Sequence, residues 1–295
     1  MKLTNNLNLP AVLVRALSAD DYSKNTKYSV TQLLKPAQAV ILEKRYWPEL
    51  EADVSESLWR FIGSAVHRFL EKGEGKNDLT EERIAFSKTS GQLDYYESET
   101  KTIYDFKMTS VWAVVFESRY EEWQKQLSLY AFLLRQAGFE VKNIAAIVMM
   151  RNWEKRDYLR GKYDVPEPIF VKHFEILDTI EGEKIENWII GKEHILDSYE
   201  KLPDHEQKPC TPAERWAKPG SYKIYWNEST AKNPTSQKNF EETQEAAARQ
   251  YCEELNEKGK GKKTYRLEFI PGENWTRCEY CNAQAVCQQF LNREA

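Results

Sequence analysis

The sequence predicts an α/β fold in which helices flank a mixed central β-sheet. Two amphipathic helices, at 55–72 and 121–138, enclose a region whose apolar residues change from helical spacing to strict alternation. Strands and helices then alternate as far as residue 202, an order typical of α/β proteins. With 295 residues, 41% of them hydrophobic, the chain can bury a large core.

The first predicted elements are helices. Residues 29–47 read as helical, because Ser29 and Gln32 have capping-box spacing and Pro36 can restart the helix after it. The helix at 55–72 carries apolar residues at helical spacing and ends at a glycine.

Strands follow these helices. Alternation within 82–108 predicts one strand and then a hairpin. After the helix at 121–138, the apolar run "NIAAIVMMRNW" is short enough to be a buried strand. Residues 169–177 predict another strand, and 181–201 predict a helix.

The amino-acid composition changes after Pro203, where prolines become frequent. One helix (241–257), one strand (264–270) and a group of cysteines are expected there. We therefore divide the chain into an N-terminal extension (1–27), a core (28–202) and a C-terminal module (203–295). Neither an internal repeat nor a glycine-rich phosphate loop is present, which argues against an ATP-driven enzyme.

Charge and hydropathy exclude some classes of protein. The net charge of −4 argues against a surface that is cationic throughout, so any phosphate contact must be local. The densest basic run, at 258–266, more often forms a solvated loop than a phosphate-binding one. No apolar stretch is long enough to span a membrane, and the N-terminus lacks a secretory pattern, so we expect a cytoplasmic protein.

The segment "GQLDYYESETKTIYDFKM" (91–108) contains charged residues of the kinds that bind metal ions and take part in catalysis. On a strand, Asp105 and Lys107 share one face, and Asp94 on the preceding strand can reach them. Two converging carboxylates suit Mg²⁺ or Mn²⁺, and the lysine can orient water or stabilise charge on a phosphate. The alternative is a surface salt bridge, because 30% of the residues are charged.

Two further patterns bear on that choice. His67 lies just off the apolar stripe of the helix at 55–72, and a lone histidine there is more often a core residue than a ligand. Gln126 and Tyr130 lie one turn apart on the next helix, where they can contact DNA or position the lysine.

The ordered series "GSAVHRFLE", "GQLD", "YDFK" and "QLSLY" resembles the RecB-like branch of the PD-(D/E)XK nuclease superfamily. The resemblance covers roughly residues 28–150 and implies a restriction-endonuclease-like core. It implies that His67, Asp94 and Asp105 are Mg²⁺ or Mn²⁺ ligands, with the Phe106 carbonyl as a further ligand. It also implies that Lys107 is the catalytic lysine, and that Gln126 and Tyr130 contact DNA or support the site.

The implied function is a metal-dependent DNA nuclease. Relatives are commonly exonucleases acting on single strands or duplex ends in recombination, repair or spacer acquisition, so an exonuclease from a bacterium or phage is favoured, with a recombination or helicase protein as a further partner. The rival is a catalytically silent, nuclease-like scaffold that binds DNA or protein and holds a structural zinc ion. A third reading is a zinc-ribbon protein with an unrelated α/β body.

The cysteines point to a second metal. Cys278, Cys281 and Cys287 have the spacing C-x-x-C-x5-C, and the nearest companion is Cys210. Four thiolates in a chain without a disulfide pattern can hold zinc or an iron–sulfur cluster. Cys252 falls on the apolar repeat of its helix and is expected to be a core residue.

This cysteine group is similar to that of iron–sulfur RecB-like exonucleases of the CRISPR-associated type. The similarity favours a [4Fe-4S] cluster over Zn²⁺. In those relatives the remote cysteine precedes the nuclease core, whereas this chain has none before Cys210. We therefore expect Cys210 to take that role from the C-terminal side of the core.

Overall fold

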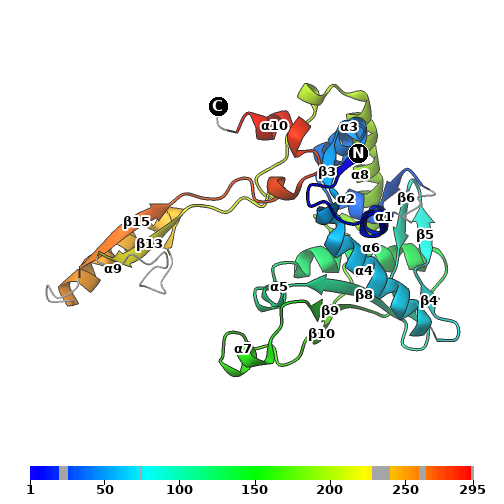
Figure 1. The fold of residues 1–295 in the computed structure, drawn as a ribbon, viewed down its shortest axis with the longest axis horizontal. Coiled ribbons are helices and arrows are strands. Elements are labelled where there is room, and N and C mark those ends of the chain that lie inside the picture. The colour runs from blue at the N-terminus through cyan, green and yellow to red at the C-terminus, as the bar shows by residue number, and fades with distance from the viewer. Residues whose placement is uncertain (20–25, 74, 228–239, 259–263, 294–295) are drawn as a thin grey trace. The chain divides into compact units, whose positions relative to one another are not determined.

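The computed structural model describes all residues except 20–25, 74, 228–239, 259–263 and 294–295 (Figure 1). The chain divides into two compact units, Met1–Gln207 and Lys208–Ala295. Much of the basic run at 258–266 lies outside the described residues. None of the described helices is long and apolar enough to cross a membrane.

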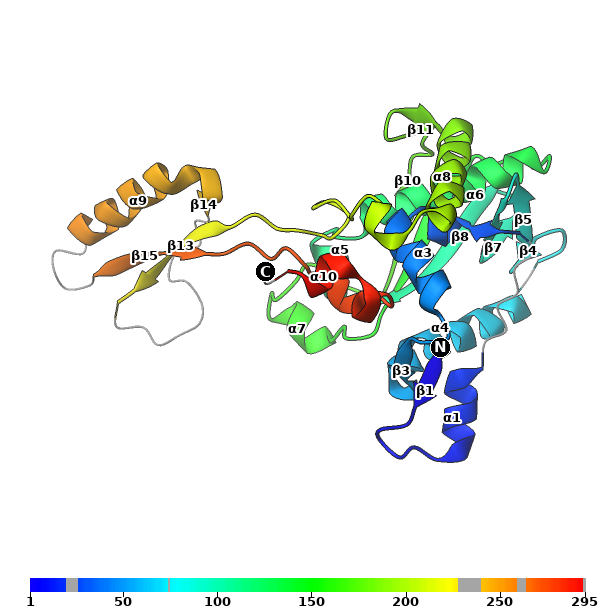
Figure 2. The same ribbon diagram turned by 90° about the horizontal axis from the view of Figure 1, so that it is seen from above.

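A five-stranded mixed sheet forms the centre of the first unit (Figures 1 and 2). Its spatial order is β10 (Ile169–Phe174), β9 (Asn143–Met150), β8 (Thr102–Thr109), β7 (Tyr95–Glu97) and β4 (Leu79–Thr80). β8 and β9 are parallel, and the other neighbours are antiparallel. The predicted α/β class with a mixed sheet is confirmed.

The central sheet lies between two helices (Figures 1 and 2). α6 (Tyr120–Gln136) packs on one face of β8 and β9, and α4 (Leu58–Leu70) lies on the other. Three more helices extend the α6 side: α2 (Val30–Leu33), α3 (Ala37–Tyr46) and α8 (Ile185–Lys201). The main hydrophobic core lies on this side and includes Leu127, Leu134, Ile103, Ile144 and Val148.

The α4 side is covered much less. α4 follows the predicted amphipathic pattern, yet none of its residues is buried. Its N-terminal part packs near α1 (Ala11–Ser18), and a short parallel ladder joins β1 (Lys2–Thr4) to β3 (Glu51–Asp53). One face of the sheet is therefore closed by a core, and the other remains open beside α4.

Local sequence signals set several helix ends. The Ser29 hydroxyl accepts a hydrogen bond from Gln32 N, and the Gln32 side chain accepts one from Ser29 N, which is the predicted capping box. Pro36 precedes the first turn of α3. Gly138 follows α6 with φ +91°, a conformation that glycine adopts without strain.

A second, three-stranded sheet lies against α6 and orders β2 (Tyr28–Ser29), β6 (Thr89–Gln92) and β5 (Arg83–Phe86). The remaining α-helices and strands described in the first unit are α5 (Val111–Val115), α7 (Lys155–Leu159), and the short hairpin of β11 (Thr179–Ile180) and β12 (Glu183–Lys184). α5 and α7 follow the carboxyl ends of the parallel strands β8 and β9.

The second unit contains a small sheet and one longer helix. Its strands lie in the order β14 (Phe240–Glu241), β13 (Ser221–Trp226) and β15 (Tyr265–Ile270), and α9 (Glu245–Lys258) packs on them. The core of this part includes Ile224, Phe240, Ala248 and Cys252. α10 (Gln288–Leu291) follows the cysteine trio. β13 was not predicted, because the surrounding prolines masked its alternation.

Candidate metal centre

The register of the hairpin brings two carboxylates to one point. Tyr95 pairs with Tyr104, so Asp94, just before β7, lies opposite Asp105 on β8. The Asp94 Oδ2 atom accepts a hydrogen bond of 2.7 Å from Phe106 N. Because β7 begins only after Asp94, the C-terminal part of β8 has no neighbouring strand on the β7 side. The Asp94 carboxylate there accepts the backbone hydrogen bond that a strand carbonyl would otherwise accept.

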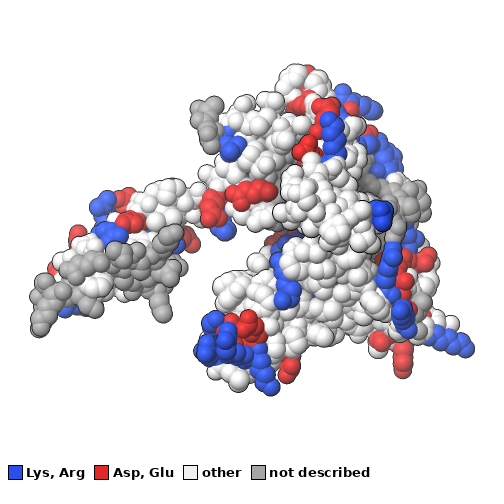
Figure 3. All heavy atoms as spheres, in the orientation of Figure 1, with Lys and Arg blue, Asp and Glu red and all other residues white. Residues whose placement is uncertain are grey.

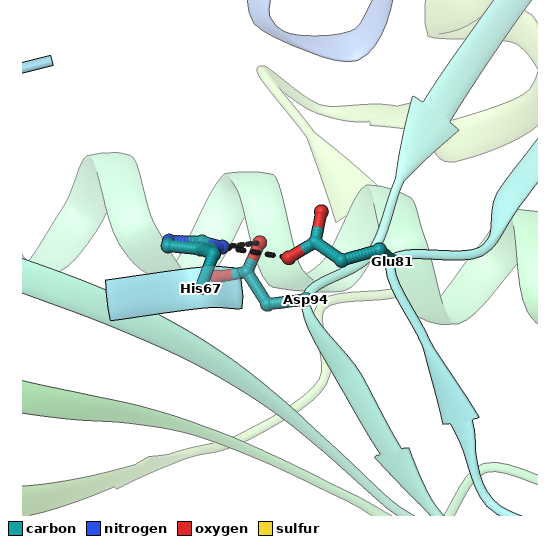
Figure 4. Close-up of side chains that lie close together, drawn as sticks. All are labelled: His67, Glu81 and Asp94. Carbon is teal, nitrogen blue, oxygen red and sulfur yellow. Dashed lines mark hydrogen bonds and ion pairs between the residues drawn. The ribbon is translucent and has the colours of Figure 1, made fainter. Parts of the chain in front are cut away.

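α4 adds His67 to this point, and a loop adds Glu81 (Figure 4). His67 Nδ1 lies 2.7 Å from Glu81 Oε1 and 3.6 Å from Asp94 Oδ1. One ligand atom from each of these three residues falls within 4.8 Å of the others, as a bound divalent cation requires. The three side chains are half-buried or largely buried, so water competes only partly for their ligand atoms.

Glu81 was missed by the sequence reasoning. It lies between β4 and β5, where neighbouring Glu82 looks equivalent in the sequence. Its backbone has φ +54°, and its N–H donates to the carbonyl of Asp94 over 3.1 Å. Its Oε2 atom accepts a hydrogen bond of 2.8 Å from Gln92 Nε2. A glutamate carries no sequence signal for this backbone conformation, so only the pairing of the strands reveals the residue.

Asp105 and Lys107 begin a second chain of contacts. Asp105 is 2% exposed, and its Oδ2 atom lies 2.6 Å from Lys107 Nζ. That oxygen accepts no hydrogen bond of good geometry from any described residue. A buried carboxylate oxygen in this condition is open to a further positive ligand. Asp105, predicted to be a ligand together with His67 and Asp94, therefore lies opposite Asp94 but is not one of the three residues whose ligand atoms lie within 4.8 Å of one another; Glu81 is the third member of that group.

Gln126 and Tyr130 complete this second chain. Lys107 Nζ donates to Gln126 Oε1 over 2.9 Å, and Gln126 Nε2 donates to Tyr130 Oη over 2.9 Å. Tyr130 is buried, and its ring lies against Gly91. In this arrangement Gln126 bridges the Lys107 ammonium and the Tyr130 hydroxyl.

Burial and crowding perturb the titration of the site. Burial raises the pKa of Asp94 to about 7, and the nearby Asp105 charge adds to that shift. The hydrogen bond to Glu81 raises the pKa of His67, and the Asp94 charge acts in the same direction. A cation would relieve this repulsion among the carboxylates, so the donor set fits Mg²⁺ or Mn²⁺.

Two tryptophans on the helices that follow β8 have different environments. Trp123 is buried in the main core, whereas Trp112 is exposed at the start of α5.

The Phe106 ring meets His67 edge-on, with centroids 6.1 Å apart. In a strand the N–H and C=O of one residue point to the same side, so the Phe106 carbonyl points toward Asp94.

The cysteines lie in the second unit. Burial raises the pKa of Cys210 to about 12, and interactions with Glu214 and with the thiols of Cys287, Cys281 and Cys278 add to it. The Gln289 side chain bonds both backbone groups of Cys210, over 2.9 Å to N and 2.8 Å to O. Cys210 is thereby held next to the cysteine trio. Within the described residues, no three cysteine sulfurs lie within 4.8 Å of one another.

Comparisons with known proteins identify one family. A model of the PD-(D/E)XK nuclease superfamily matches residues 14–288. The solved structure of SSO0001 is similar at 15% identity and a TM-score of 0.41, over 65% of this chain and 86% of that one. A phage-related exonuclease from Haemophilus somnus 129PT is similar at 11% identity and a TM-score of 0.28, over 66% and 78%. A search of curated proteins found no match.

Proposed function

The chain belongs to the PD-(D/E)XK nuclease superfamily, and from that membership we propose that it is a divalent-metal-dependent DNA nuclease of the RecB-like branch. The observation that carries the proposal is the convergence of His67, Glu81 and Asp94 next to the buried Asp105–Lys107 pair. A binding protein gains nothing from crowding three carboxylates where phosphates must approach, unless a cation offsets their charge.

In this proposal His67, Glu81, Asp94 and Asp105 hold the cation, with the Phe106 carbonyl as a further ligand. When bound, Mg²⁺ or Mn²⁺ supplies a Lewis acid and lowers the pKa of a bound water. The chain's own residues then position the reactants. Lys107, held by Asp105 and Gln126, keeps its ammonium beside the carboxylates, where it orients the attacking water or stabilises charge on the phosphate oxygens.

The substrate is DNA, and the favoured mode is exonucleolytic removal of nucleotides in recombination-type or repair-type processing. This part of the proposal rests on the resemblance of the ordered motifs to RecB-like nucleases. Circular single-stranded DNA decides the mode, because an exonuclease requires an end and leaves the circle intact.

The test measures Mn²⁺-dependent degradation of labelled single-stranded and duplex DNA. We expect Asp105→Asn, Lys107→Met and Glu81→Gln each to lower the rate by at least roughly 100-fold, as the loss of positioned electrostatic groups does. Glu82→Gln is the matched control, since Glu82 is exposed beside Glu81, and it should keep the wild-type rate. DNA binding without Mn²⁺-dependent cleavage by the wild-type protein would favour the silent scaffold instead.

We further propose that Cys210, Cys278, Cys281 and Cys287 hold a [4Fe-4S] cluster rather than zinc. The donor set fits either metal, and the resemblance to iron–sulfur RecB-like exonucleases favours the cluster. The thiol of Cys210 is protonated at neutral pH and its raised pKa further opposes loss of the proton, so a metal must displace that proton on binding. Visible absorption and metal analysis of anaerobically purified protein separate iron from zinc.

A further inference from the structure

An exposed aromatic pair lies at the end of the strand that carries the acidic site. Trp112 of α5 and Phe116, which follows the last residue of α5, stack with ring centroids 5.7 Å apart and an interplanar angle of 18°. Trp112 is 40% exposed and Phe116 is 71% exposed, although both are large and apolar. Tyr163 supports Trp112 edge-on at 5.8 Å. The stack is therefore held from behind while one face of Phe116 remains open to solvent.

A second aromatic side chain lies near the same end of the sheet. Trp59 of α4 is 51% exposed, and the Arg151 guanidinium lies over its ring at 4.2 Å. Arg151 N donates to Thr109 O over 2.9 Å, and Val111 N donates to the Asn152 side chain over 2.8 Å. These bonds place Arg151 beside the β8 residues that lead into α5.

Two elements, β8 and α4, lead from the acidic site toward these aromatic groups. Thr109 follows Asp105 by four residues of β8, or about 13 Å. Trp59 precedes His67 by eight residues of α4, or about 12 Å. A stacked single strand spans such a distance with roughly four nucleotides.

The charge around this end of the sheet suits a polyanion. Residues 151–162, which follow β9 and include α7, contain five Lys or Arg and two Asp or Glu. Figure 3 shows blue side chains gathered over α7, which Figure 1 places beyond the tip of β8. Exposed aromatic rings with neighbouring basic groups form the common platform for single-stranded nucleic acid.

We propose that Phe116, supported by Trp112, stacks on a base of a single-stranded segment whose backbone continues to the metal centre. Trp59 and Arg151 form the second contact, in which Arg151 meets a phosphate. The surface thus selects unpaired bases, because a base pair inside a duplex does not present its face to a protein ring. The path of the bound nucleic acid toward the metal centre rests on the proposed nuclease function. The binding of a single-stranded segment to the aromatic rings does not.

The experiment measures binding of a labelled oligothymidylate by fluorescence anisotropy in EDTA, where no metal-dependent cleavage occurs. We expect Phe116→Ala to raise Kd by roughly 5- to 150-fold, as the loss of one stacked base does. The salt dependence of its Kd should stay that of the wild type, because no charge is removed. Arg151→Ala should instead reduce the slope against salt by about one phosphate contact.

Three controls sharpen this test. Trp47→Ala removes a tryptophan that is 47% exposed after α3, and it should leave Kd unchanged. Phe116→Tyr keeps the ring and should bind like the wild type. An abasic oligonucleotide of the same length offers phosphates without bases, so the wild type and Phe116→Ala should bind it equally.

Two results would overturn the platform. One is wild-type affinity of Phe116→Ala for oligothymidylate. The other is equal binding of the abasic chain and oligothymidylate by the wild-type protein. That result would show that the rings do not bind bases, and a protein partner would then be the better candidate for this face. Cleavage assays with Mn²⁺ distinguish the two proposals. Base-dependent binding without cleavage would support the aromatic platform and contradict the nuclease proposal. Cleavage with base-independent binding would support the nuclease proposal and contradict the platform.

Discussion

Glu81 holds a backbone conformation that costs a non-glycine residue free energy, and its side chain explains why it is kept. A residue with positive φ costs roughly 1–3 kcal/mol and persists where its surroundings over-determine it. Here the N–H of Glu81 bonds to Asp94 O, while its two carboxylate oxygens meet His67 and Gln92. The strained loop therefore aims a carboxylate at the same point as Asp94.

The raised pKa of Asp94 predicts how stability depends on pH without metal. An unfolded aspartate releases its proton near its ordinary value of 3.8, whereas folded Asp94 keeps it to about 7. Between these values the folded state binds more protons, so the free energy of unfolding falls as pH rises. His67, whose pKa is also raised, acts in the same direction.

We expect urea unfolding in EDTA to show this decline between about pH 4 and 7, and Asp94→Asn to flatten it. The Asn side chain still accepts the hydrogen bond from Phe106 N but carries no charge to bury. A wild-type stability that rises over this range would contradict the assignment. Adding Mn²⁺ should remove the decline, since the ion favours ionised Asp94.

Gly91 supports the site through packing. A Cβ atom at this position would come within 2.7 Å of a Tyr130 ring carbon and 3.0 Å of Leu133. We expect Gly91→Ala to lower the free energy of unfolding by about 1–3 kcal/mol, the usual cost of overpacking. It should also weaken catalysis, because Tyr130 holds Gln126 and thereby Lys107.

Gly191→Ala serves as the control for that prediction. Gly191 lies within α8, and a Cβ there meets nothing within 4 Å. We expect this change to stabilise the protein by about 0.5–1 kcal/mol. Thermal unfolding of both variants measures the difference, and an equal response of the two would show that Tyr130 does not constrain Gly91.

At the scale of elements, α8 fastens the turn between β5 and β6. The buried Glu193 carboxylate accepts hydrogen bonds from Ser87 Oγ (2.6 Å), Lys88 N (2.9 Å) and Thr89 Oγ1 (2.7 Å). These three donors close a turn in which Ser87 has φ +54°. A single side chain thus joins the second sheet to the helix that packs over the core.

Glu193→Ala should therefore cost about 3 kcal/mol in unfolding free energy, because buried donors lose a charged acceptor. Chemical denaturation measures this value. His194→Ala changes an exposed neighbour on α8 and should stay within about 0.5 kcal/mol of the wild type. A small effect of Glu193→Ala would mean that water replaces the carboxylate.

Elements with strong periodicity were predictable from the sequence. The helices at 55–72, 121–138 and 181–201 were placed within a few residues of α4, α6 and α8, because each buries or half-buries one face. The alternation of 82–108 predicted one strand and a hairpin, but the structure has four strands there, because the expected strand around Asp94 breaks into β6 and β7, which lie in different sheets. That division depends on which strands pair at long range, and local alternation carries no information about it.

The candidate site was predictable only in part for the same reason. The motif residues His67, Asp94, Asp105, Lys107, Gln126 and Tyr130 were named in advance, and the structure places them in two adjoining groups. Glu81 reaches the site through the contact of a loop with Asp94, which no spacing rule encodes. The open aromatic pair at α5 required knowledge of burial.

At the scale of the whole molecule, the second unit has little buried apolar surface to stabilise its fold. Its small core comprises few residues, and the segments around the cysteines contain several prolines and little apolar surface. Backbone bonds such as Lys218 N to Glu273 O and Arg277 N to Arg215 O join the two segments. Segments that bury so little gain order from metal binding.

Cys278→Ser should therefore loosen the second unit and spare the first. We expect hydrogen exchange to accelerate across 208–220 and 271–293, while β8 and β9 keep their protection, because the core of Met1–Gln207 contains no cysteine. Cys252→Ala is the matched control: its thiol packs with Ala248 in the separate core, so metal content should stay that of the wild type. A Cys278→Ser protein that retains both its metal and its protection would show that the hydrogen bonds between the segments hold the unit together without a metal.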